Sequence, residues 1–73
     1  MTHVKFNHIE IRNIKTILKQ YIDEILARYN ESSSKEFLEK ARRGIYMNAE
    51  DDAVELRQLL LFYTNLQEIL NNL

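Results

Sequence analysis

Helix-breaking residues are almost missing from this chain. Its 73 residues include no proline and a single glycine, Gly44. A sheet of several strands needs many turns, and turns depend heavily on these two residue types, whereas long helices exclude them. The composition therefore predicts an all-α protein, and the length allows one small helical domain, residues 1–73.

Three segments carry the apolar spacing of helices. The first, about 8–29, repeats apolar side chains every three or four positions; the second, about 34–43, is short; the third, about 49–72, keeps the rhythm to the end. This order predicts a three-helix bundle of two long antiparallel helices and a short middle helix. The expected inward stripe of the first helix comprises Ile11, Ile14, Leu18, Tyr21 and Ile25, flanked by Ile17, Ile22 and Tyr29.

Each expected helix begins at a residue whose side chain can accept a bond from a free backbone N–H group. Asn7 with Glu10, and Ser33 with Glu36, have the spacing of capping boxes, and Asn48 can cap the third helix. The single glycine follows the middle helix, where a left-handed cap is expected. The apolar connector after it, "IYM", is expected to pack into the core.

Five consecutive apolar residues, 59–63 ("LLLFY"), fall within the third helix. Packing on one face needs an apolar residue only every three or four positions, so the run predicts a second buried surface. No such second face is expected on the first helix. The residues expected to meet another chain, in the simplest case a second copy in a homodimer, are Val54, Leu61, Phe62 and Ile69.

The charges nearly balance, at ten basic and eleven acidic residues, so no overall field draws the chain to nucleic acid or membrane. One side of the first helix nevertheless carries a basic edge, formed by His8, Arg12, Lys15 and Lys19. Such an edge is either a solvated flank or an anion-facing surface, and both interpretations stay open. The acidic start of the third helix, "AEDDAVE", argues against a helix-turn-helix that reads DNA.

Residues with catalytic or metal-binding potential are sparse. The chain has two histidines, five positions apart, and no cysteine or glycine-rich phosphate loop. Its longest apolar run is far below the roughly 20 residues that span a bilayer. We therefore expect no catalysis, metal, cofactor or membrane, and a cytoplasmic regulator or inhibitor that binds another protein. The alternative is a nucleic-acid-associated regulator that uses the basic edge.

Overall fold

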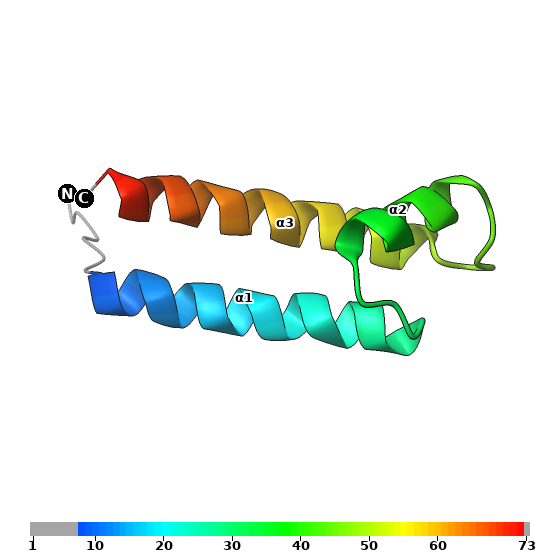
Figure 1. Cartoon of the computed structure of the whole chain (residues 1–73), viewed down its shortest axis with the longest axis horizontal. Coiled ribbons are helices and arrows are strands. Elements are labelled where there is room, and N and C mark those ends of the chain that lie inside the picture. The colour runs from blue at the N-terminus through cyan, green and yellow to red at the C-terminus, as the bar shows by residue number, and fades with distance from the viewer. Residues whose placement is uncertain (1–7, 73) are drawn as a thin grey trace.

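A computed structural model describes residues 8–72 of the chain, and at His8 it describes the backbone alone. The helices are α1 (His8–Arg28), α2 (Ser34–Arg42) and α3 (Glu50–Asn71) (Figure 1). The prediction of an all-α fold with two long helices and a short one between them is confirmed. The described segment outside these helices forms turns and short connectors.

The two long helices form an antiparallel hairpin (Figure 1). Arg28, at the end of α1, donates to Asp52, in the first turn of α3, with 2.8 Å between Nη1 and Oδ1. Further along, Lys15 of α1 donates to Gln67 of α3. The radius of gyration is 14.6 Å, whereas a compact domain of this size has about 11 Å, so the hairpin is elongated.

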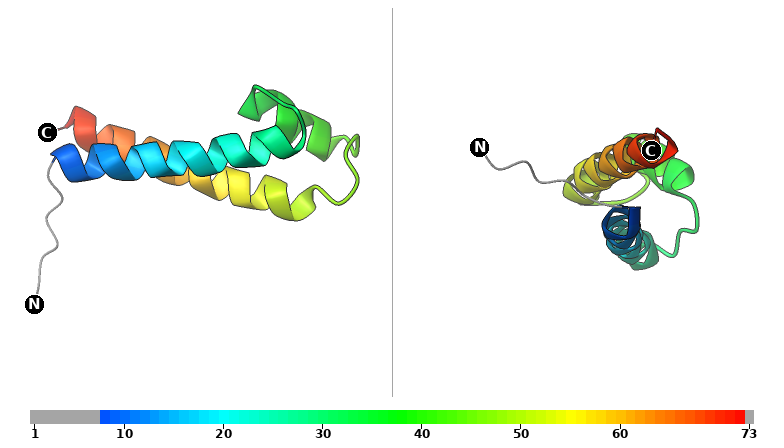
Figure 2. Two further views of the ribbon diagram at one scale, coloured as in Figure 1. Left: turned by 90° about the horizontal axis from the view of Figure 1, so that it is seen from below. Right: turned by 90° about the vertical axis from the view of Figure 1, so that its left-hand side faces the viewer.

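The short helix α2 packs on one side of the hairpin, at the end where its connecting loops lie. The end-on view in Figure 2 shows α2 to one side of the plane that holds α1 and α3. With nine residues against 21 in α1, it spans about 14 Å of a hairpin about 31 Å long. It therefore covers only part of one side.

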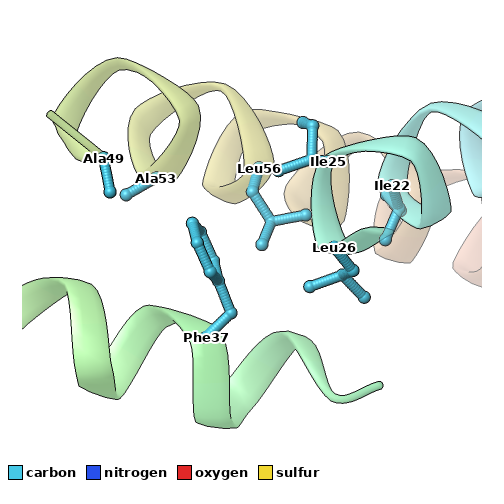
Figure 3. Close-up of a cluster of buried hydrophobic side chains, with 7 residues drawn as sticks. All are labelled: Ile22, Ile25, Leu26, Phe37, Ala49, Ala53 and Leu56. Carbon is cyan, nitrogen blue, oxygen red and sulfur yellow. The ribbon is translucent and has the colours of Figure 1, made fainter. Parts of the chain in front are cut away.

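The core has two clusters, and only one of them involves α2. The first lies beneath α2 and comprises Ile22, Ile25, Leu26, Phe37, Ala49, Ala53 and Leu56 (Figure 3). The second lies between α1 and α3 alone and comprises Ile11, Leu18 and Leu66. Since a pair of helices cannot surround a core, the second cluster has only two walls.

The expected start and end of α2 are confirmed. The Ser33 hydroxyl accepts a bond from the Glu36 N–H group at 3.3 Å, which satisfies one of the free donors of the first turn. Gly44 is left-handed, with φ 76°, and the Ile45 N–H group donates to the Lys40 carbonyl at 3.0 Å. This pattern closes a helix while it satisfies the last carbonyl groups.

The prediction that Asn48 caps α3 is wrong. Asn48 has a left-handed backbone, with φ 58°, and the N-cap position of α3 falls to Ala49, which makes no side-chain cap bond. The methyl group of Ala49 is buried in the cluster beneath α2, so packing fixes the start of the helix where the cap is absent. The box expected at Asn7 lies outside the described residues.

The connector after α2 is only partly packed, so the prediction for it is largely wrong. Tyr46 packs against the first cluster. Its neighbours Ile45 and Met47 are 53% and 87% exposed. The chain bends at Tyr46 and turns at Met47, so the connector presents only the Tyr46 ring to the core.

Candidate protein-binding surface

One long side of the hairpin lies opposite α2. On α3, Leu60 packs against the cluster beneath α2, and Gln67, seven residues or about two turns later, lies on the same side. Gln67 accepts the bond from Lys15, which places Lys15 on that side of α1. These three residues therefore mark the side of the hairpin that carries α2.

Exposed apolar side chains lie on the other side. A residue two positions further along a helix points about 200° away. Ile17 stands two positions after Lys15, Phe62 two after Leu60, and Ile69 two after Gln67. These three apolar residues therefore lie on the side opposite α2. Tyr21 lies one turn after Ile17. We call these four residues the bare face; their exposed fractions are 50% (Ile17), 51% (Tyr21), 50% (Phe62) and 47% (Ile69).

The predicted interface residues are all exposed, but they do not form one surface. Phe62 and Ile69 belong to the bare face. Val54 and Leu61, at 50% and 64% exposure, lie about 60–100° from Phe62 and Ile69 around α3, on its outer ridge, away from α1. Their contact with another chain stays a prediction, and the structure separates it from the face that both long helices share.

The expectation that α1 has no second apolar face is wrong. Tyr21, which the sequence places in the inward stripe, and Ile17, which it places on the flank of that stripe, are half exposed. Leu26, absent from that stripe, is 6% exposed and packs with Phe37 beneath α2. The inward side of α1 is therefore rotated toward α2, and this rotation leaves Ile17 and Tyr21 on the opposite side.

The basic edge of α1 gathers around a shallow depression on the α2 side. Arg12, Lys15 and Lys19 line this depression, whose volume is about 400 Å³, together with Thr16 and Tyr63. Lys15 is engaged within the chain, because its Nζ atom donates to Gln67 and lies 4.9 Å from the centre of the Tyr63 ring. The fourth predicted member, the His8 side chain, lies outside the described part.

A cluster of aromatic and charged side chains holds the loop end together. The rings of Tyr29, Phe37 and Tyr46 contact one another, with centroids 4.7 Å apart for Tyr29 and Phe37 and 4.9 Å for Tyr29 and Tyr46. Each tyrosine hydroxyl donates to a carboxylate: Tyr29 to Asp52 and Tyr46 to Glu31. The hydrogen bond raises the pKa of each tyrosine, with desolvation second.

Glu31 anchors the start of the loop to the end of α2. Its Oε1 atom accepts bonds from Lys40, at 2.7 Å, and from the Tyr46 hydroxyl. The bond from Lys40, and after it the bond from Tyr46, hold the pKa of Glu31 below its usual value. The same bond to Glu31 raises the pKa of Lys40. The Glu31 side chain is only 6% exposed, so solvent screens the Glu31–Lys40 pair less than it screens the surface pair Arg42–Glu39.

The stability of the protein should depend on the protonation of Glu31. Its pKa is lower in the folded chain than in the unfolded chain, so its contribution is present above the unfolded value of about 4.3 and is lost as the pH falls through the folded value. Urea unfolding of Glu31→Gln should show a lower stability than wild type at neutral pH and a smaller difference below pH 4. Glu39→Gln, at an exposed pair, is the control with the smaller effect. Parallel pH profiles for wild type and Glu31→Gln would contradict this role.

No family model, curated protein or solved structure matches the chain. None of the described helices combines the length and apolarity that crossing a membrane requires. Within the described residues, no three histidine, aspartate or glutamate side chains are grouped as a metal site requires. The bare face and the basic edge are therefore the two surfaces from which a function can be argued.

Proposed function

We propose that this protein is a non-catalytic helical interaction module of the cytoplasm, a regulator or inhibitor, that binds a further protein molecule through the bare face. One observation carries this proposal: both α1 and α3 have half-exposed apolar side chains on the side of the hairpin opposite α2. Single exposed apolar residues are common on any protein surface, whereas a group drawn from two neighbouring helices is typical of an interaction site.

The spacing on the bare face suits a helical partner. Ile17 and Tyr21 are four residues apart on α1, and Phe62 and Ile69 are seven apart on α3. Side chains at these intervals form the ridges that pack into the grooves of another helix. The partner is therefore a protein that presents helices, either a second copy of this chain or a different molecule.

The basic edge supports a second candidate, a nucleic-acid-associated regulator. Arg12, Lys15 and Lys19 lie around one depression and could contact a phosphate backbone. Lys15 is already bonded to Gln67, which leaves two of the three cations for such a contact. The exposed carboxylates at the start of α3, Glu50 and Asp51, oppose a polyanion at the loop end. This candidate ranks second for these two reasons.

Affinity capture with matched variants should identify the surface in use. The tagged chain in host extract should retain a protein partner, and Phe62→Glu should lose it, because a carboxylate replaces an apolar contact. Leu61→Glu is the matched control, since Leu61 is adjacent, apolar and also exposed, but lies on the outer ridge.

Two results would redirect the proposal. Equal retention by wild type and Phe62→Glu would show that the bare face is not the binding surface. Loss of all captured material after nuclease treatment, or in Arg12→Gln/Lys19→Gln but not in Phe62→Glu, would favour the nucleic-acid candidate.

A further inference from the structure

We infer that the partner on the bare face is a second copy of this chain, and that the two hairpins form an antiparallel four-helix bundle with each α2 on the outside. This inference rests on the proposed use of the bare face for protein binding. The second core cluster has helices on two sides only, and two further helices on the bare face would cover one of its open sides. Because α2 lies on the opposite side, it leaves the bare face free for such an approach (Figure 2).

The area available matches what a dimer needs. Four half-exposed apolar side chains offer roughly 100 Å² each, or about 400 Å² in each protomer. A standard interface buries about 800 Å² of each partner, of which a little over half is apolar. The bare face therefore supplies nearly all the apolar part of one standard interface, and its surrounding polar side chains supply the rest.

The residues that border the bare face suit a meeting of like with like. Four exposed amide side chains lie next to the bare face, three or four positions from its residues and farther from the core: Asn13, Gln20, Gln58 and Asn65. An amide both donates and accepts, so it can bond its own copy, whereas a border of one charge would repel itself and favour an oppositely charged partner. Two exposed carboxylates, Glu24 and Glu55, lie on the same side of their helices, two turns from Ile17 and Phe62. With the axis placed as below, each stands about 15 Å or more along the helices from its own copy, beyond a Debye length, so the border is compatible with a second copy.

Two pairs of residues on α1 indicate the level at which we expect the two-fold axis to cross this helix. Glu10 stands seven residues, or about two turns, before Ile17, and Arg28 stands seven residues after Tyr21. Both charged residues therefore lie on the same side of α1 as Ile17 and Tyr21. The midpoint of each of these two pairs is residue 19. If the axis crosses the helices at this level, Ile17 lies opposite Tyr21 of the partner subunit. Glu10 then lies opposite the partner's Arg28, whose guanidinium also bonds Asp52 of its own chain.

The register of the hairpin places Phe62 at the same level. In an antiparallel pair, one helix counts down as the other counts up. The bond of Lys15 to Gln67 then places residue 19 beside residue 63, and the bond of Arg28 to Asp52 places it beside residue 61. Phe62 is the member of that group on the bare face. The axis that pairs the α1 residues therefore also brings Phe62 against its own copy, at the centre of the interface, where aromatic side chains contribute most.

Sedimentation equilibrium of the purified chain tests the choice of partner. Wild type and Leu61→Glu should be dimers at micromolar concentrations, and Phe62→Glu should have a dissociation constant raised about 100-fold or more while circular dichroism shows it still helical. A wild-type monomer at high micromolar concentration would overturn the inference and leave the proposed function to a different partner, which the capture experiment detects. Dissociation by Leu61→Glu but not by Phe62→Glu would move the dimer to the outer ridge and overturn it too.

Cross-linking tests the position of the axis, because the native chain contains no cysteine. Phe62→Cys, first shown to be dimeric in reducing buffer, should form a disulfide-linked dimer readily under a glutathione redox buffer. Leu61→Cys, on the outer ridge, is the control and should remain largely uncross-linked. A dimeric Phe62→Cys that cross-links no faster than Leu61→Cys would contradict an axis beside Phe62.

Discussion

Replacing Phe37 by alanine is expected to detach α2 from the hairpin and to lower the free energy of unfolding by about 3–5 kcal/mol. The Phe37 side chain is 0% exposed and is the largest of the fully buried side chains in the described chain. It is also the only residue of α2 in the buried cluster that joins this helix to α1 and α3 (Figure 3). Without the ring, a nine-residue helix is too short to persist on its own.

Urea unfolding and amide hydrogen exchange of Phe37→Ala would check this expectation. The amides of α2 should exchange much faster than in wild type, and those of α1 and α3 should keep more of their protection. Leu38→Ala, at a partly buried neighbour on the same helix, is the control and should have a smaller effect. The variant should still be dimeric, because Phe37 lies on the side opposite the bare face. Wild-type protection of α2 would contradict the role assigned to the ring.

Leu56→Ala is expected to destabilise the whole fold, by about 2–5 kcal/mol. Leu56 is 0% exposed and belongs to the cluster in which α3 meets both α1 and α2. The loss is a large share of the stability of so small a domain, and exchange should therefore accelerate in all three helices. Leu60→Ala, one turn later and only partly buried, should cost less. A loss below about 1 kcal/mol would show that the site collapses around the smaller side chain.

Local signals in the sequence account for most of the helix boundaries. The near absence of breakers and the three-to-four-residue apolar rhythm predict the three helices, and Ser33 and Gly44 mark the start and end of α2 because their roles depend on backbone geometry alone. Asn48 shows where such signals fail. Asparagine both caps helices and tolerates the left-handed backbone, and the sequence does not tell which role it takes.

The candidate surface was harder to predict, because it depends on where α2 packs. The apolar arc of α1 is wider than one buried face, so spacing alone cannot decide which edge of the arc is inside. In the folded chain Leu26 is buried with Phe37, Leu60 packs against their cluster, and the opposite edge, with Ile17 and Tyr21, is left exposed. Phe62 and Ile69 are the two residues that the sequence-based prediction and the bare face share; the run 59–63, which contains Phe62, exceeds what a single face can bury.

Intermolecular contacts at the bare face can be observed directly by nuclear magnetic resonance on a mixture of isotope-labelled and unlabelled wild-type chains. Isotope-filtered nuclear Overhauser effects report only contacts between different molecules. We predict such effects between the ring protons of Phe62 and those of the partner subunit's Phe62, and between the methyl groups of Ile17 and the ring of the partner's Tyr21. A spectrum without intermolecular effects, or with effects confined to Val54 and Leu61, would contradict the dimer through the bare face.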